Sequence, residues 1–305
     1  MAARDGARPV GVPGAPHAGL PPQDVIGQPV PIILPDPATL FARRADRLAV
    51  LAEGHPMAAW LHFMASLARA QQVACDTMPR LPPIELVAGL PPLAADTHPR
   101  DPSWRAALSR VLELAADPAV PEPARVVLAG LRGQDPEPLA TQYLLGRVPA
   151  ARAGEAMAVA AALQVYFACR AAALPVAALS LLPQRGLCPV CGSAPVAGVI
   201  TAAGTTPGVR YLHCGLCATA WNHARAVCVG CGESKGLALQ AIEDGSRAVK
   251  AETCDMCHGY LKMVYQAEDM DVDPMADDLA SLGLDLLVSE AGWSRLAPNP
   301  LVLAG

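Results

Sequence analysis

The chain has 305 residues, of which 52% are hydrophobic and only 4% aromatic, and it carries a formal net charge of -5. This length is enough for about two domains with a sizeable buried core. Nucleic-acid-binding proteins usually carry an excess of basic residues, which this chain lacks, so no nucleic-acid partner is expected.

Residues 1–31 are rich in glycine and proline and contain no long apolar run. This composition predicts a disordered tail and not a secretory signal. The most apolar window, residues 156–182, is interrupted by Gln164 and Arg170, which makes it a buried core helix and not a membrane span. We therefore expect a cytoplasmic protein without membrane insertion.

An all-helical domain is predicted for residues 32–184. Asp36 is a plausible N-cap with Pro37 in the first helical position, and the apolar stripe that follows ends at Gly54. A proline-rich, extended linker is expected at residues 79–102. Further helices are predicted over residues 60–75, 103–114, 124–131, 138–145 and 154–173. We find no nucleophile, base or phosphate-loop constellation in this half, which predicts a protein that is not an enzyme.

Two features of the helical domain have alternative interpretations. Arg43, Arg44 and Arg47 fall on one side of the first helix, as either a solvated face or a partner-binding face. Cys75 and Cys169 each lie on an apolar helix, where a single cysteine usually acts as a small hydrophobic residue.

The composition changes near residue 183, and eight of the ten cysteines follow in four Cys-x-x-Cys pairs. Cys188 and Cys214 are 26 positions apart, as are Cys228 and Cys254, so the second set repeats the first 40 positions later. This duplication predicts two metal modules, at residues 185–226 and 227–266. The expected ligands are Cys188, Cys191, Cys214 and Cys217 in the first module and Cys228, Cys231, Cys254 and Cys257 in the second.

Each module is predicted to hold two Cys-x-x-Cys turns, or knuckles, joined by a hairpin. Two residues between cysteines let both sulfurs face one ion, and the hairpin brings the second knuckle opposite, giving a tetrahedral four-sulfur site. Gly192 and Gly232 follow their knuckles, where a positive φ would turn backbone N–H groups toward the thiolates. The equal gaps favour sequential sites, with an interleaved pairing as the alternative.

The strands of these hairpins are expected at residues 195–200, 209–213, 236–242 and 248–253, with a turn at Asp244–Gly245 in the second module. Four sulfur ligands suit either zinc or iron. Because eight cysteines fill both sites, His213, His223 and His258 are interpreted as neighbours of the ligands or surface residues.

Residues 267–305 are predicted to form an acidic segment and a C-terminal helix. The acidic run from Glu268 to Asp278 is either solvated or a partner surface. The helix is expected from Met275 to Ala291, with its apolar face against the body of the protein. The residues expected on that face are Leu279, Leu282, Leu286 and Leu287. The fold class is thus α+β, a helical domain followed by two tandem rubredoxin-like or zinc-ribbon modules and a C-terminal helix.

Several segments together resemble the formate dehydrogenase accessory proteins, the FdhE-type maturation factors. They are Leu34–Phe41, Gly54–Pro56, Cys188–Val196, Tyr211–Trp221, Lys250–Cys257, Tyr260–Lys262, Asp271–Leu282 and Leu284–Leu287. The resemblance runs from about residue 32 to the C-terminus and includes all eight paired cysteines. The glycine- and proline-rich tail departs from the family pattern.

This resemblance implies a cytoplasmic, non-catalytic protein needed to assemble active respiratory formate dehydrogenase. It implies contact with the catalytic, molybdopterin-binding subunit, and it favours iron in two four-cysteine sites, with zinc as the alternative. Two other functions compete with this one: a rubredoxin-like iron protein for redox chemistry or oxygen sensing, and a zinc-ribbon protein that binds nucleic acid.

Overall fold

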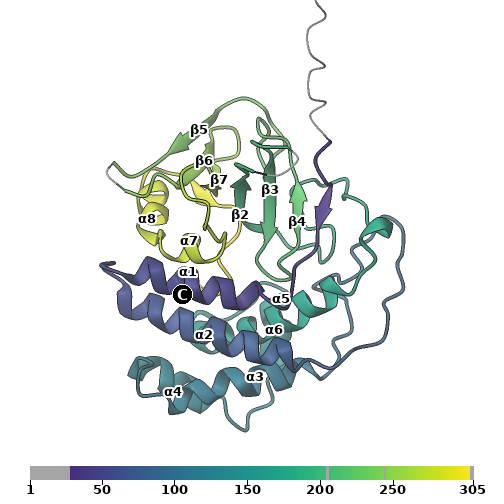
Figure 1. Ribbon diagram of the computed structural model, residues 1–305, viewed down its shortest axis with the longest axis vertical. Helices are drawn as coiled ribbons and strands as arrows, with labels where there is room; N and C mark the ends of the chain where they lie inside the picture. Colours follow the sequence, from purple (N-terminus) through teal and green to yellow (C-terminus); the bar gives the residue numbers. More distant parts are fainter. Residues whose placement is uncertain (1–27, 204–205, 244, 303–305) are drawn as a thin grey trace, which may run out of the picture.

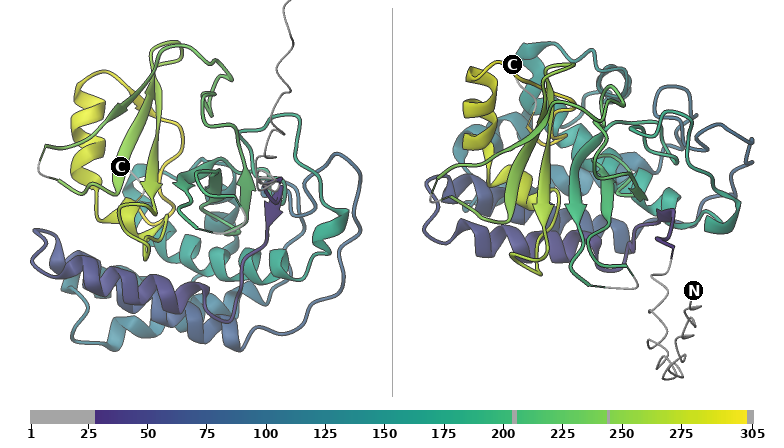
Figure 2. Two further views of the ribbon diagram at one scale, coloured as in Figure 1. Left: turned by 45° about the horizontal axis from the view of Figure 1, so that its top comes forward. Right: turned by 90° about the horizontal axis from the view of Figure 1, so that it is seen from above.

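The computed structural model describes residues 28–203, 206–243 and 245–302. Most of the predicted tail, up to residue 27, and Asp244 of the predicted turn lie outside these ranges. In the described part, helices α1 and α2 run below a mixed β-sheet, and the C-terminal helices lie beside the strands of the second module (Figures 1 and 2). The chain therefore has the expected combination of helices and strands.

The helical half holds six α-helices. They are α1 (Leu40–Ala52), α2 (Ala58–Asp76), α3 (Trp104–Leu112), α4 (Glu122–Gly130), α5 (Glu137–Leu144) and α6 (Ala153–Ala172). The centre of the bundle is α6, whose small alanine side chains let neighbouring helices approach and are buried almost throughout. The predicted start of the first helix is wrong, because α1 begins at Leu40 with Thr39 as its N-cap. Asp36 lies in the preceding turn, where it accepts hydrogen bonds from Ala38 N and Thr39 Oγ1.

The strands form one eight-stranded sheet. They are β1 (Ile32–Ile33), β2 (Pro195–Ile200), β3 (Arg210–Cys214), β4 (Ala220–Asn222), β5 (Leu237–Gln240), β6 (Val249–Cys254), β7 (Gly259–Tyr265) and β8 (Ser294–Arg295). Their order is β1-β4-β3-β2-β7-β6-β5, with β8 paired to the start of β7. Strands β2–β4 and β5–β7 are the two copies of the 40-residue repeat.

The two modules are joined edge to edge, which the sequence did not predict. Strand β2 pairs in parallel with β7, with Gly198 opposite Met263. A Cβ atom at Gly198 would lie 2.5 Å from Met263 Cε, so glycine leaves room for the Met263 side chain across this pairing. The predicted tandem modules are therefore parts of one continuous sheet.

The predicted C-terminal helix is broken into two helices, α7 (Ala276–Leu279) and α8 (Leu282–Glu290). The break occurs where Lys262 Nζ donates to the carbonyl oxygens of Asp278, at 2.9 Å, and Ser281, at 3.0 Å. Helix α8 consequently buries Leu284 and Val288. The prediction that Leu286 and Leu287 face the body is wrong, because these side chains are 67% and 51% exposed.

Part of the acidic segment is folded against Arg44 and Arg47 of α1. Arg43 stays exposed, as the solvated-face interpretation predicts. Arg47 Nη2 lies 2.6 Å from Asp277 Oδ1 and 2.8 Å from Asp269 Oδ2. Arg44 is buried, with its Nε 3.5 Å from Asp273 Oδ1. These ion pairs join residues more than 200 positions apart and fasten the C-terminal region to the helical half.

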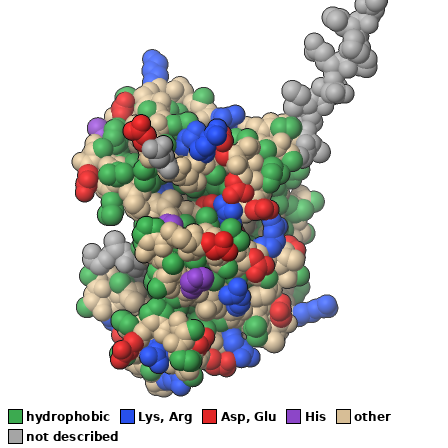
Figure 3. Space-filling model, turned by 60° about the vertical axis from the view of Figure 1, so that its left-hand side comes forward, with side chains coloured by type: hydrophobic (Ala, Val, Ile, Leu, Met, Phe, Trp, Pro, Cys, Tyr) green, Lys and Arg blue, Asp and Glu red, His purple; other side chains and the backbone are tan. Residues whose placement is uncertain are grey.

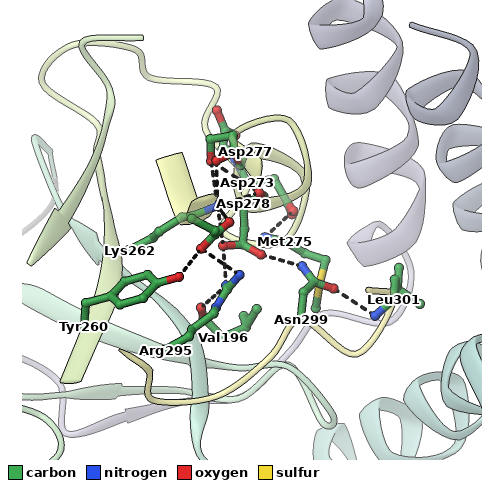
Figure 4. Close-up of polar contacts among 12 residues, drawn as sticks. Val196, Tyr260, Lys262, Asp273, Met275, Asp277, Asp278, Arg295, Asn299 and Leu301 are labelled. Atoms are coloured by element: carbon green, nitrogen blue, oxygen red, sulfur yellow. Dashed lines mark hydrogen bonds and ion pairs between the residues drawn. The ribbon is translucent and has the colours of Figure 1, made fainter. Parts of the chain in front are cut away.

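A second ion cluster is centred on Lys262 and Asp278 (Figure 4). Lys262 and Asp278 are both 0% exposed, with Nζ 3.3 Å from Asp278 Oδ1. Arg295 and Asp285 complete the cluster, and Asn299 Nδ2 donates to Asp278 Oδ2 at 2.7 Å. The two cations and two carboxylates balance in charge, as burial of ionised groups requires.

Candidate metal centres

Each set of four cysteines gathers its sulfurs within 4.8 Å of one another, and each set is sequential and not interleaved. In the first site the Sγ–Sγ separations are 3.5 Å for Cys188 and Cys217 and 3.3 Å for Cys191 and Cys214. In the second site the separations are 3.7 Å for the equivalent Cys228 and Cys257 and 3.8 Å for Cys231 and Cys254. Tetrahedral sulfurs bound at about 2.3 Å would stand about 3.8 Å apart. Both sites therefore fit a metal ion bound by four thiolates.

The knuckles owe their shape to left-handed residues. Gly192 and Gly232 have φ values of 76° and 78°, and each donates its N–H to the carbonyl of the first cysteine in its knuckle. The expected positive φ at both glycines is confirmed. The other two knuckles place non-glycine residues in this region, Ala218 at 57° and His258 at 53°. Such a conformation is uncommon outside glycine and persists where the surrounding structure imposes it.

The first site lies in the protein core. All four of its cysteines are at most 3% exposed. Burial, followed by the neighbouring sulfurs, raises the pKa of Cys188 well above its ordinary value. Four thiolates can therefore share this position only around a cation, which supplies the compensating charge.

The helical half holds the first site directly. Leu93 N and Ala95 N, in the proline-rich linker, donate to the carbonyl oxygens of Val190 and Cys191, both at 2.9 Å. From α6, Gln164 Nε2 donates to Gly215 O at 2.6 Å. The polar residue that interrupts the apolar window is thus a contact to a knuckle. In the sequence, Gln164 stands out as a polar residue in an apolar helix. The sequence does not show that its hydrogen-bond partner is Gly215.

The second site is built on the same plan and is more open. Cys228 and Cys254 are buried, whereas Cys231 and Cys257 are exposed. On one side the site is closed by Leu296, whose side chain lies against Gly230 and Gly259.

None of the three neighbouring histidines belongs to either sulfur cluster. His213 lines a cavity of about 580 Å³ between α1 and the sheet, beside Cys214, and burial lowers its pKa to about 4. The His223 ring faces Arg210, with Nδ1 3.2 Å from Nη2, and the carbonyl of His258 accepts from Ser294 N.

Cys75 on α2 and Cys169 on α6 are not isolated hydrophobic residues. Their sulfurs lie 2.8 Å apart, although 94 positions separate them in sequence. Sequence reasoning missed this pair, because neither residue belongs to a Cys-x-x-Cys motif.

Models of the FdhE N-terminal, central and C-terminal domains match residues 29–183, 187–225 and 227–302. The chain is 41% identical to a protein FdhE homolog of Edwardsiella ictaluri, over 92% of this chain and 94% of that protein. It is 36% identical to protein FdhE of Escherichia coli K12, over 90% and 92%.

A solved structure extends these similarities to the fold. The crystal structure of the FdhE protein from Pseudomonas aeruginosa matches with a TM-score of 0.80 at 38% identity, covering 90% of this chain and 99% of that one. The three domain models together span the helical half and both modules. This chain therefore belongs to the FdhE family of formate dehydrogenase accessory proteins.

Proposed function

We propose that this protein is an accessory factor required for the maturation of active respiratory formate dehydrogenase, and that it binds the catalytic, molybdopterin-binding subunit in the cytoplasm. The observation that carries the proposal is the match to all three FdhE domain models across residues 29–302. The relatives at 36–41% identity over most of the chain support the same role.

A binding role, and not catalysis, fits the chemistry of the two sites. Four thiolates complete a tetrahedral shell and leave no open position for substrate, unlike catalytic metal sites with three protein ligands. In this proposal Cys188, Cys191, Cys214 and Cys217 hold one ion, and Cys228, Cys231, Cys254 and Cys257 hold the other. A bound ion supplies folding energy to the modules. The family favours iron, and the same ligands suit zinc.

One face of the molecule lacks the charge pattern of a nucleic-acid-binding surface. On the face shown in Figure 3, Lys and Arg side chains lie among Asp and Glu and do not gather into a basic patch. Nucleic-acid-binding surfaces concentrate positive charge to neutralise phosphates. No helix in the described ranges is long and apolar enough to cross a membrane.

The test is anaerobic purification of the tagged full chain, with metal analysis and a pull-down of the catalytic subunit from the same organism. We expect the catalytic subunit to co-purify and two metal ions per chain. A matched control uses another molybdopterin enzyme of the same cells, which should not co-purify. Failure to retain the catalytic subunit under these conditions would contradict the proposed partner.

A redox role is the second candidate, favoured by the exposure of Cys231 and Cys257 in the second site. An exposed iron–thiolate site can reach an electron-transfer partner. This candidate predicts the visible absorption of ferric thiolate in the purified protein. Zinc as the sole metal would remove it without affecting the accessory role.

A further inference from the structure

The 40-residue repeat allows the two sites to be compared position by position. Cys191 and Cys217 of the first site are 1% and 0% exposed. Their equivalents in the second site, Cys231 and Cys257, are exposed. The other two cysteines are buried in both sites, namely Cys188 and Cys214 in the first and Cys228 and Cys254 in the second. The sites thus share their ligands and differ at one matched pair of sulfurs.

The same two positions differ in their hydrogen-bond partners. In the first site, Ser193 Oγ lies 3.4 Å from Cys191 Sγ, and Thr219 Oγ1 lies 3.2 Å from Cys217 Sγ. When these sulfurs are thiolates, the hydroxyl groups donate to them. A hydrogen bond to the charged form stabilises it and makes the ligand harder to displace.

The second site has no hydroxyl at the equivalent positions, which are occupied by Glu233 and Gly259. Glu233 is exposed and places an acidic side chain close in sequence to Cys231. Gly259 cannot be replaced by a larger residue without contact, because its Cβ would lie 2.6 Å from Leu296 Cδ2. At these two matched positions, the buried sulfurs have a hydroxyl neighbour and the exposed sulfurs do not.

The protein also covers the two sites differently. The linker and α6 hydrogen-bond to the backbone of both knuckles of the first site, through Ala95 and Gln164 for example. The second site is closed by Leu296 on one side, whereas Met256, inside its last knuckle, is 61% exposed. An incoming ligand can therefore approach the second site without local unfolding.

We propose that the second four-cysteine site exchanges its metal ion with external thiol ligands through Cys231 and Cys257, whereas the first site retains its ion as part of the core. In each exchange step the metal–sulfur bond of one exposed cysteine breaks and a bond to the incoming sulfur forms. The proton of the incoming thiol passes to the released cysteine, and no electron is transferred. This proposal goes beyond the accessory role and does not depend on it.

The test uses the purified full chain loaded with two zinc ions and mixed with excess glutathione as the external thiol, while 4-(2-pyridylazo)resorcinol, a coloured zinc chelator, reports the released zinc. We expect two kinetic phases of one ion each, with the first at least about tenfold faster. A single phase for both ions would overturn the proposal. Because the assay contains no formate dehydrogenase, its outcome is independent of the accessory role.

Thiol labelling assigns the phases to the sites. The zinc-loaded chain is treated with N-ethylmaleimide and mapped by peptide mass spectrometry. Peptides containing Cys231 and Cys257 should be labelled first, because reactivity follows exposure of the thiolate. Earlier labelling of Cys191 or Cys217 would overturn the assignment.

Two matched substitutions test the hydroxyl argument. Glu233→Ser restores the residue type found at the equivalent Ser193 and should slow the fast phase, whereas Glu233→Gln removes only the charge and should slow it less. Ser193→Ala should accelerate the slow phase while leaving it the slower one. Equal slowing by the two Glu233 variants would contradict a role for the missing hydroxyl in ion release.

Discussion

Replacing Lys262 by methionine tests whether the buried ion cluster holds the C-terminal region in place. Methionine keeps most of the apolar stem of the lysine and removes its charge. In the native protein Lys262 Nζ reaches Asp278 Oδ1, Asp278 O and both oxygens of Ser281 at 2.9–3.3 Å, and it also pairs with Asp285. The substitution leaves the buried carboxylate of Asp278 and the partly exposed one of Asp285 with Arg295 as the sole remaining cation in the cluster.

The expected cost follows from this imbalance. Removing one partner of a buried ion pair destabilises a protein by about 3–5 kcal/mol, because an uncompensated charge stays buried. For a chain of this size such a loss lowers Tm by about 10 °C. Thermal unfolding of the metal-loaded protein, followed by circular dichroism, measures it.

The control is Lys235→Met, which removes a lysine from an exposed position of the second module. We expect its free energy of unfolding to stay within about 0.5 kcal/mol of the wild type. The double variant Lys262→Met/Asp285→Asn should be less destabilised than the sum of its single variants, because removing one carboxylate restores the charge balance. If Lys262→Met unfolds like the wild type, the cluster does not stabilise the fold.

Three further predictions concern cysteines and pH. Cys188→Ala should remove one metal ion and lower Tm markedly, because its site is in the core. Cys257→Ala should also remove one ion, with a smaller decrease in Tm, because its site is exposed. Equal decreases in Tm would contradict this difference. A mild disulfide-type oxidant should link Cys75 to Cys169, which lie 2.8 Å apart, with a mass lower by two hydrogens; peptide mapping that finds both thiols free would refute it. Burial opposes the charge on Glu137, but hydrogen bonds from Arg100, Trp104 and Arg105 outweigh burial and lower the pKa of Glu137. The Glu137 carboxylate therefore stabilises the fold above its ordinary pKa of about 4.3, and this stabilisation is lost as the pH falls below that value. Glu137→Gln should therefore lower stability at neutral pH and not in acid, in denaturation curves at both pH values.

The two four-cysteine modules could be predicted from sequence because the features that define them are local in sequence. Cys-x-x-Cys pairs repeated 40 positions later define the knuckles, the hairpins and the sequential grouping of the sulfurs. The glycine after the first knuckle of each module likewise predicts a positive φ, and the φ values of Gly192 and Gly232 are both positive. Such features depend on neighbouring residues alone.

The packing of the modules against the rest of the protein could not be predicted from local sequence patterns. The partner of Arg47 is Asp277, 230 positions later, and no periodicity in either segment specifies that distance. At the break between α7 and α8, the Asp278 carbonyl oxygen accepts from Lys262, a residue outside both helices. Helical spacing alone therefore placed Leu286 and Leu287 on the wrong face. Exposure differences between the two sites also arise from long-range covering by the linker and α6.

The most direct test of the accessory role is respiratory formate dehydrogenase activity in cells that lack this gene. We predict that activity is lost in the deletion strain although the catalytic subunit is still produced. Supplying the wild-type chain should restore the activity. Undiminished activity in the deletion strain would contradict the proposed function.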